Sequence, residues 1–553
     1  MKVAREKSII EYFYHWEKET PDNIFLKQPF GEEFVDFSWK EAGIQIRKIS
    51  SYLKSLNLPP KTNIALISKN CAEWIITDLA IIQSGNVSVP LYPTLTGPQI
   101  NQVLEHSGSP VAFIGKIDNW QEMKSGIPKE VNCVSFPTYN PDPSHTQWND
   151  ILEKFPVDNS TFIPNLEELH TIIYTSGTTG NPKGVMLNFK AASECIYETR
   201  NFTFLERPGT RFFSYLPLCH IAERNIVESV CIVTGGVIYF AENLETFSKN
   251  LQVANPTHFL AVPRIWTKFQ QGILLKLPQK KLDLLLSIPI VSGLIKKKIK
   301  KGLGLNDAWI CLTGAAPMPL SLILWFRKVG INIQEAYGMT ENAGAVTMMP
   351  GNKSVDGSVG KIYPGMEVKI DPANGEILTR SKWNMMGYYK EPQMTADTID
   401  SEGYIHTGDV GEVDAEGFLK ITGRVKEMYK TSKGEYVAPA QIEMGFSGNP
   451  EIEQVCVVGQ SLPQPIALMV LSDYGKTIHK ETIEEKLKAV LKDLNNSLKS
   501  YEKINKIVLL KEPWTVENNK MTPTMKIKRN VIEKEFEKKY EDWFESPGTL
   551  IFE

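Results

Sequence analysis

The sequence predicts an α/β protein with a large N-terminal domain of helix-covered sheets and a small C-terminal α+β domain. Three observations predict this fold class. A chain of 553 residues is too long for one compact core. Strand and helix patterns alternate from about residue 40, as in parallel sheets covered by helices. After GRVKEMYKTSKGEY the chain becomes rich in Lys and Glu, which places the junction between the domains near Arg424.

Local periodicity locates the individual elements. Between residues 39 and 56, the apolar residues Ile46, Ile49 and Leu53 share one face of a helix. Short β-branched runs then alternate with longer helical stretches, and residues 130–165 have the composition of a surface excursion. The expected strands are 63–68, 87–92, 111–115, 453–459 and 466–471, and the expected helices are 39–56, 70–85, 97–108 and 481–501.

Bulk composition narrows the class of protein. Hydrophobic residues make up 42% and charged residues 23% of the chain, as in an ordinary folded protein. The net charge of −3 argues against a general nucleic-acid binder. The seven cysteines are scattered without a CxxC pair, the N-terminus lacks a secretory signal pattern, and no membrane-spanning apolar run occurs. We therefore expect a cytoplasmic protein with reduced thiols.

One segment departs from the alternation. Residues 281–301 read KLDLLLSIPIVSGLIKKKIKK, an apolar run that ends in a lysine cluster. The pattern has two interpretations: a partly buried helix with a solvated basic end, or, over residues 284–301, peripheral contact with a membrane surface. Pro289 and Gly293 interrupt the run, which favours the first interpretation.

The stretch TIIYTSGTTGNPKG, residues 171–184, has the composition of a phosphate-binding loop. It is not a Walker loop, because Pro182 stands where the second glycine belongs and Gly184 where a Mg²⁺-binding hydroxyl belongs. Glycines allow close approach of the backbone to a ligand, hydroxyls donate to phosphate oxygens, and a lysine adds charge. The candidate phosphate contacts are Thr175, Ser176, Gly177, Thr178, Thr179, Gly180 and Lys183.

YTSGTTGNPKG resembles the signature loop of the adenylate-forming superfamily, which comprises acyl-CoA synthetases, luciferases and peptide-synthetase adenylation domains. Further motifs follow in the family's order, so that the resemblance covers about residues 20–535. It implies an N-terminal adenylation domain over residues 1–424 with a β-rich subdomain. A mobile C-terminal domain over residues 427–553 would swivel at the hinge residue Lys426. ATP and CoA are the implied co-substrates, and Mg²⁺ the implied cofactor.

Two further motifs resemble the family's adenine and phosphate sites. LTGAAP is similar to a strand end whose small residues admit a flat base. In QEAYGMTEN, the resemblance implies that Tyr337 stacks on adenine, Thr340 contacts the α-phosphate and Glu341 holds Mg²⁺, with Thr175 as a second metal contact. The other residues that these motifs assign to the nucleotide are Gly314, Ala315, Ala316, Pro317, Glu335, Ala336 and Gly338.

The motifs near the domain junction supply charged contacts. In GYIHTGDVG, Asp409 matches the carboxylate that accepts hydrogen bonds from the ribose hydroxyls. In ITGRVKEMYKTSKGEYVAP, Arg424 matches a ribose and phosphate contact. Lys430 and Tyr436 correspond to further nucleotide contacts, with one extra residue between them in this chain.

MTPTMKIKR contains the candidate catalytic lysine. Lys526 matches the family's lysine that reaches from the small domain to the carboxylate and the α-phosphate. The usual glycine before it is Met525 here. With Lys526 and Glu341, the third candidate catalytic residue is His220, which lies in SYLPLCHIAER, a segment similar to that of long-chain fatty acyl-CoA synthetases.

The same resemblance assigns a channel for the acyl group and CoA. His220 would line it, Trp266 in VPRIW would gate the fatty-acid tunnel, and the loop of Lys433 and Gly434 would meet the pantetheine. The expected function is therefore long-chain fatty acid:CoA ligation, with a fatty acid, ATP and CoA as partners. Two alternatives remain open: an acyl-AMP ligase that loads a carrier protein, and a non-catalytic paralogue that binds acyl groups or nucleotide. A homo-oligomer is also left open.

Overall fold

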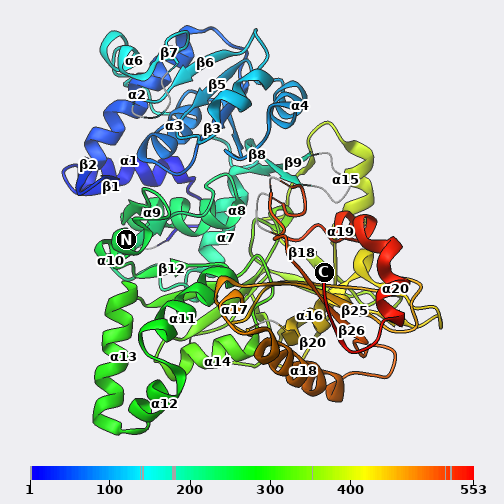
Figure 1. The fold of residues 1–553 in the computed structure, drawn as a ribbon. Helices are drawn as coiled ribbons and strands as arrows, with labels where there is room; N and C mark the ends of the chain where they lie inside the picture. The colour runs from blue at the N-terminus through cyan, green and yellow to red at the C-terminus, as the bar shows by residue number, and fades with distance from the viewer. Residues whose placement is uncertain are drawn as a thin grey trace.

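The computed structural model describes residues 3–137, 139, 142–176, 182–351, 353–446, 448–516, 518–522 and 526–553, except the side chain of Ser176. Two mixed sheets build a large N-terminal domain, and a smaller C-terminal domain packs beside it (Figure 1). This arrangement confirms the α/β fold class with a large sheet domain and a C-terminal domain.

The first sheet has eight strands in the order β19-β9-β8-β4-β3-β5-β6-β7. Strand β3 pairs in parallel with β4 and β5, and all five of its residues are buried, as expected for a sheet covered on both faces. The strands are β3 (Asn63–Ile67), β4 (Val87–Leu91), β5 (Val111–Ile114), β6 (Asn132–Ser135), β7 (Thr146–Gln147), β8 (Leu169–Ser176), β9 (Pro182–Asn188) and β19 (Gly387–Tyr388). The helices beside it are α2 (Trp39–Ser55), α3 (Ala72–Gln83), α4 (Gly97–Ser107), α5 (Trp120–Met123), η1 (Lys124–Gly126) and α6 (Trp148–Lys154).

The second sheet has 13 strands and changes from parallel to antiparallel at β14. Strand β14 pairs in parallel with β13 and antiparallel with β15, and the strands beyond it form the β-rich part of the domain. In sheet order the strands are β17 (Glu367–Ile370), β18 (Glu376–Arg380), β20 (Ile405–Val413), β21 (Phe418–Arg424), β16 (Gly360–Ile362), β15 (Thr347–Met348), β14 (Ile333–Tyr337), β13 (Ile310–Thr313), β12 (His258–Leu260), β10 (Arg211–Ser214), β11 (Val237–Phe240), β1 (Ile24–Phe30) and β2 (Glu33–Ser38).

Helices and short helical turns connect these strands. Their bounds are α1 (Ile9–Glu19), α7 (Phe189–Thr199), α8 (Ile221–Glu223), the π-helical η2 (Arg224–Ser229), α9 (Val230–Thr234), α10 (Phe247–Ala254), α11 (Pro263–Lys276), α12 (Gln279–Ser287), α13 (Pro289–Leu303), α14 (Leu320–Lys328), η3 (Thr340–Asn342) and α15 (Pro392–Thr398). The lysine-rich segment is thus two helices rather than one, because Pro289 starts α13, where its missing N–H costs no hydrogen bond. No helix of the described residues is long and apolar enough to cross a bilayer.

The C-terminal domain is built on a four-stranded sheet in the order β24-β25-β26-β27, with a separate β22-β23 hairpin. Its strands are β22 (Tyr429–Lys430), β23 (Tyr436–Val437), β24 (Ile452–Val458), β25 (Ile466–Leu471), β26 (Lys506–Leu510) and β27 (Leu550–Phe552). Its helices are η4 (Val425–Glu427), α16 (Pro439–Phe446), α17 (Asp473–Lys476), α18 (Lys480–Ser497), α19 (Arg529–Phe536), η5 (Glu537–Lys539) and α20 (Tyr540–Glu545). The expected strands at 453–459 and 466–471 and the expected helix at 481–501 are confirmed within a few residues.

A buried ion pair in the core of the N-terminal domain joins α3 to η2. Arg224 Nη2 donates to both carboxylate oxygens of Asp78 at 2.7 Å, and both side chains are buried. The Ser88 hydroxyl also donates to Asp78. Burial, and then the charge of Asp78, raise the pKa of nearby Glu228. A buried carboxylate of this kind is strongly destabilising without its partner.

We therefore expect Arg224→Met to lower the free energy of unfolding of the N-terminal domain by about 3–5 kcal/mol, because it leaves Asp78 charged and unpaired. Adding Asp78→Asn should restore part of the loss. Urea unfolding followed by tryptophan fluorescence measures both. Lys154→Met, at the exposed Lys154–Asp150 pair, is the control and should cost less than about 1 kcal/mol. An equally small effect of Arg224→Met would contradict the prediction.

Candidate active site

The candidate phosphate loop connects two antiparallel strands. Strand β8 ends at Ser176 and β9 begins at Pro182, and Thr175 is the register partner of Lys183. The loop is therefore the tip of a hairpin, whereas a Walker loop leads from a strand into a helix. The predicted phosphate contacts Gly177, Thr178, Thr179 and Gly180, and the side chain of Ser176, lie outside the described residues.

Lys183 and Glu341 are connected through a tyrosine that the sequence motifs did not indicate. Tyr388 donates a hydrogen bond of 2.7 Å from its hydroxyl to Glu341 Oε1, and Lys183 Nζ lies 5.3 Å from the centroid of its ring. Burial, and then the charge of Glu341, raise the pKa of Tyr388. Glu341 itself is buried on η3. The adjacent tyrosines Tyr388 and Tyr389 are visible in the sequence, but Glu341, the hydrogen-bond partner of Tyr388, is 47 residues away.

A second cluster centres on Asp409. Tyr337 donates to Asp409 Oδ2 at 2.7 Å, and Arg424 Nε donates to Oδ1 at 2.7 Å. The arginine contact follows from the sheet, since Asp409 and Arg424 are register partners on β20 and β21. Burial, and then Asp409, raise the pKa of Tyr337. The sequence motifs predict that these three residues contact the nucleotide, and the structure brings them together.

The LTGAAP segment forms a tight turn beside this cluster. Strand β13 ends at Thr313, and a Cβ on Gly314 would lie 2.9 Å from the carbonyl oxygen of Ala336 on β14. Ala315 has a left-handed φ of 63°. The side chains that the turn leaves exposed are Ala315, Ala316 and Pro317.

The QEAYGMTEN segment packs closely as well. A Cβ on Gly338 would meet the backbone of Gly344 at 2.2 Å, so the close approach there requires glycine. Thr340 is buried. Burial, and then Asp356, raise the pKa of the neighbouring Glu335 to about 8.

Lys526 of the C-terminal domain faces these groups of the N-terminal domain. Its pKa is lowered by burial and then by the charge of Arg424, while Asp409 and Glu341 raise it. Protein groups surround the ammonium group, although the residue remains accessible to solvent. Two hydrogen bonds join Thr522 and Lys526, one from Thr522 N to Lys526 O at 2.8 Å and one from Lys526 N to Thr522 Oγ1 at 3.0 Å.

His220 lies at the start of α8, close enough to Lys526 for their charges to interact. Burial, and then the charge of Lys526, lower the pKa of His220 to about 4. Its Nδ1 accepts a hydrogen bond from the backbone N–H of Ala222 at 3.3 Å. The imidazole is therefore neutral near pH 7 and carries its proton on Nε2.

Trp266 is fully buried on α11. Its Nε1 donates to the carbonyl oxygen of Leu312 at 3.4 Å, which joins α11 to β13. Its ring packs against Phe259 and Phe326, with centroids 5.5 Å and 5.1 Å away. The residue therefore lies directly behind the candidate adenine turn, and its role as a gate stays a prediction.

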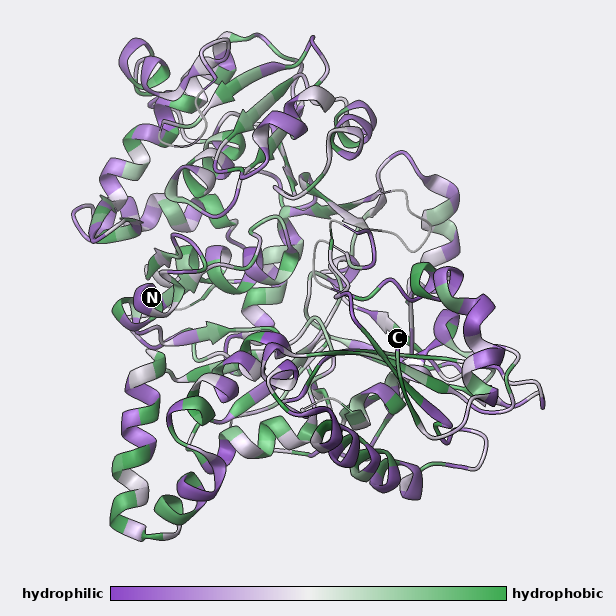
Figure 2. Ribbon diagram, in the orientation of Figure 1, coloured by the Kyte–Doolittle hydropathy of each residue, from purple (hydrophilic) through white to green (hydrophobic). Residues whose placement is uncertain are grey.

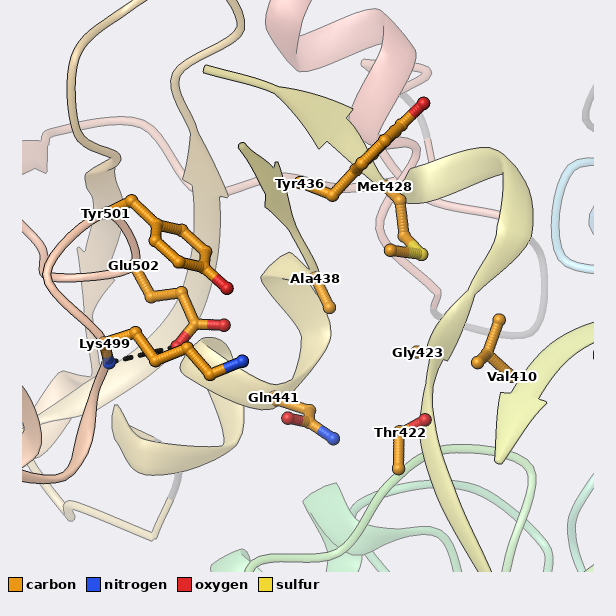
Figure 3. A pocket seen from close by; sticks show the side chains of 10 residues that line it. All are labelled: Val410, Thr422, Gly423, Met428, Tyr436, Ala438, Gln441, Lys499, Tyr501 and Glu502. Carbon is orange, nitrogen blue, oxygen red and sulfur yellow. Dashed lines mark hydrogen bonds between the residues drawn. The ribbon is translucent and has the colours of Figure 1, made fainter. Parts of the chain in front are cut away.

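The β22-β23 hairpin carries four other predicted residues. Lys430 Nζ lies 4.9 Å from the centroid of the Tyr436 ring, and Lys433 and Gly434 form the turn, with a φ of 81° at Gly434. Tyr436 also lines a pocket of about 320 Å³ between β21 and the C-terminal domain (Figure 3). Among the described residues, no hydrogen bond or ion pair joins this hairpin to Asp409 or Lys526, so its nucleotide role stays a prediction.

One ion pair crosses the domain boundary, and a second set of ionic contacts lies within the C-terminal domain. Arg264 of α11 pairs with Glu453 of β24 across the domain boundary at 2.6 Å. Within the C-terminal domain, Arg529 pairs with Glu443 at 2.7 Å and lies 3.9 Å from Glu427, next to Lys426. Arg529 comes three residues after Lys526. It therefore connects the segment that follows Lys526 to α16 and to Glu427 at the domain junction.

Two family models match the chain, one in each domain. The family model "AMP-binding enzyme" matches residues 13–389, and the model "AMP-binding enzyme C-terminal domain" matches residues 427–547. The chain belongs to the AMP-binding enzyme family. The resemblance to adenylate-forming enzymes is thereby confirmed. The first match ends one residue after β19, which ends at Tyr388. The second match begins at Glu427, the last residue of η4.

Individual members of the AMP-binding enzyme family resemble the chain over nearly its whole length. "Long-chain-fatty-acid--CoA ligase FadD15" of Mycobacterium bovis is 28% identical, covering 97% of this chain and 96% of that protein. "Long chain acyl-CoA synthetase 2" of Arabidopsis thaliana is 29% identical, covering 94% and 89%. The crystal structure of the anthranilate CoA ligase AuaEII with anthranoyl-AMP has a TM-score of 0.78 at 18% identity, covering 97% and 99%, and shows a shared fold.

We expect Arg264→Glu to loosen the C-terminal domain, because it places two carboxylates opposite each other where the Arg264–Glu453 pair stood. The effect of one partly exposed pair is up to about fivefold in the population of the docked arrangement. Small-angle scattering and the rate of proteolysis near Lys426 measure it. The charge swap Arg264→Glu with Glu453→Arg should restore the wild-type values. Failure of the swap to restore them would contradict the prediction.

Proposed function

We propose that this chain is an ATP-dependent long-chain fatty acid:CoA ligase. It would activate the acid as an acyl-AMP with release of pyrophosphate, and then transfer the acyl group to CoA. The observation that supports the proposal is that Lys526 of the C-terminal domain lies close enough to Arg424, Asp409 and Glu341 of the N-terminal domain for their charges to interact. The names of the similar proteins support the long-chain substrate and CoA as acceptor.

In the first half-reaction, the acid oxygen attacks the α-phosphorus of ATP and pyrophosphate leaves. Positioning and charge neutralisation provide most of the catalysis in such a transfer. We assign neutralisation to Lys526, which would contact both the carboxylate and the α-phosphate. The loop of residues 175–184 would hold the departing pyrophosphate. Asp409 would accept the ribose hydroxyls, and Tyr337 and the LTGAAP turn would enclose the adenine.

Mg²⁺ fits the residues present. Glu341 is a buried carboxylate held by Tyr388, and Thr175 on β8 offers a hydroxyl. No group of three or more His, Cys, Asp or Glu that could hold a metal occurs among the described residues. One carboxylate together with nucleotide phosphates is the usual arrangement for Mg²⁺. The ion would neutralise phosphate charge when bound, and Glu341 and Thr175 would orient it.

The second half-reaction needs space for the CoA thiol where Lys526 stands. We propose that residues 427–553 rotate as a mobile domain against residues 1–424, with Lys426 as the hinge. The hairpin turn of Lys433 and Gly434 would then face the pantetheine, where glycine leaves room for a thin chain. His220, neutral at physiological pH, would line the channel without adding charge. The seven buried, unpaired cysteines support a reducing, cytoplasmic location.

Lys526→Ala should separate the two half-reactions. We expect acyl-AMP formation to fall by about 10²–10³-fold, because one charged transition-state contact is lost. Thioester formation from supplied acyl-AMP should be largely retained. Lys503→Ala, at an exposed lysine of the same domain, is the control for both rates. An equal loss in both half-reactions would contradict separate roles for the two arrangements.

The lowered pKa of Lys526 predicts a pH effect. Only the protonated lysine neutralises charge, so acyl-AMP formation should fall as the pH rises through that pKa, below the range of an ordinary lysine. The Lys526→Arg variant keeps its positive charge at any practical pH. We expect it to form acyl-AMP more slowly than the wild type, but its rate should persist to higher pH. The pH profile of ATP–pyrophosphate exchange tests this. An identical alkaline limb in both proteins would contradict the assignment.

A pyrophosphate-release screen tests the function itself. Acids from acetate to long-chain fatty acids are supplied with ATP, with and without CoA, and the products are separated. The proposal expects release to increase with chain length and acyl-CoA to form only with CoA. Acyl transfer to a carrier protein but not to CoA would favour the acyl-AMP ligase. No pyrophosphate release with any acid would favour a binding paralogue.

A further inference from the structure

Helices α12 and α13 form a hairpin that projects from the N-terminal domain on the side away from the C-terminal domain (Figure 1). We call residues 279–303 the α12–α13 hairpin. No residue of α13 is fully buried, and in α12 only Leu282 is. The free end of the hairpin is largely hydrophobic, and hydrophilic residues follow it along α13 (Figure 2). The nucleotide cleft does not use this element.

The outer face of α13 has an apolar half and a basic half. Ile290 and Leu294 are 82% and 66% exposed, and the exposed lysines Lys297, Lys298 and Lys301 continue the same face at helical spacing. The inner face is separate: Ile295, Ile299 and Leu303 pack against the domain core. Packing against the domain core therefore accounts for the apolar residues of the inner face, whereas it does not account for those of the outer face.

Exposed apolar side chains concentrate here. Sixteen large hydrophobic residues are exposed in the described part of the chain, and five of them fall within residues 275–294. Single exposed apolar residues are ordinary, but a contiguous group marks an interaction site. We call the four on the hairpin the apolar tip: Leu284, Ile288, Ile290 and Leu294.

Positive charge surrounds the apolar tip. Residues 276–301 contain eight lysines and one aspartate, in a chain whose net charge is −3. None of these lysines forms an ion pair with another described residue. Two of them, Lys298 and Lys301, also line a pocket of about 520 Å³ together with Lys249 of α10. The charge is therefore available to a partner.

We propose that the α12–α13 hairpin docks the protein on an anionic lipid bilayer, with the apolar tip in the interface and the lysines among the headgroups. The dimensions fit: Ile290 and Lys297 are seven residues apart on one helix, about 10 Å at 1.5 Å per residue. Interfacial helices bury their apolar face by about 5–10 Å, and each lysine near an anionic surface contributes about 1 kcal/mol. The hairpin enters the interface with its tip and does not span the bilayer.

Nucleic acid and a second protein copy fit less well. A nucleic-acid site would combine the lysines with stacking aromatic or polar side chains, whereas the apolar tip is aliphatic. A second copy of the chain would bring the same uncompensated positive charge against this one. A bilayer with anionic headgroups complements both halves of the face.

Vesicle flotation of the full-length protein tests the proposal, using phosphatidylcholine with and without phosphatidylglycerol at physiological ionic strength. We expect binding only with phosphatidylglycerol. Ile290→Ser with Leu294→Ser should weaken it at least about tenfold, because two inserted side chains are lost. Lys297→Gln with Lys298→Gln should weaken it about fivefold for each lysine. The matched control, Val35→Ser with Ile163→Ser, removes exposed apolar residues elsewhere and should bind as wild type.

Several results would overturn the proposal. These are absence of wild-type binding, equal binding to neutral vesicles, and unchanged binding of the Ile290→Ser/Leu294→Ser variant. Loss of concentration-dependent self-association in that variant, with vesicle binding unchanged, would assign the face to a second copy. Loss of single-stranded RNA binding in the Lys297→Gln/Lys298→Gln variant alone would assign it to nucleic acid.

Site-specific labelling gives an independent measurement. All seven native cysteines are buried, so a cysteine introduced at the exposed Ser287 takes a thiol-reactive environment-sensitive dye selectively. Its emission should shift to the blue on phosphatidylglycerol vesicles, while Asn159→Cys should show no shift. A shift at both positions or at neither would contradict docking through the hairpin. Neither experiment uses catalysis, so their outcome is independent of the proposed ligase activity.

Discussion

A positive charge carried by one domain and held among charged groups of the other is the constraint on which this structure depends. Lys526 lies beside Arg424, Asp409 and Glu341, although its turn belongs to the C-terminal domain. Repulsion from Arg424 and partial burial oppose this position, and the two carboxylates favour it. The contacts at the domain boundary, the Arg264–Glu453 pair among them, hold the two parts together against that repulsion.

The carboxylates in the cleft are oriented before any ligand arrives. Asp409 receives hydrogen bonds from Tyr337 and Arg424, and Glu341 receives one from Tyr388. Side chains held in this way lose little further freedom on binding, so more of the interaction energy is available for affinity and alignment.

The sequence was informative where the signal is local. Strand β3 follows from a short apolar run and helix α2 from the 3.6-residue period, and Asp409 and Arg424 follow from recognisable motifs. The contact between Tyr388 and Glu341 joins separate motifs, so no spacing indicates it. Pro289 interrupts the apolar run in the sequence, but the sequence pattern predicts one helix there, and the exposure of the outer face of α13 depends on what packs against it in three dimensions.

The link from Arg529 to Glu443 and Glu427 has a consequence for how such a protein can diversify. It holds the segment that follows Lys526 against the rest of the C-terminal domain. Sequence changes in the N-terminal domain therefore need not alter the position of Lys526 within the C-terminal domain. Chimaeras that exchange whole C-terminal domains between relatives should therefore tolerate divergence in the acyl pocket far better than divergence along the shared boundary.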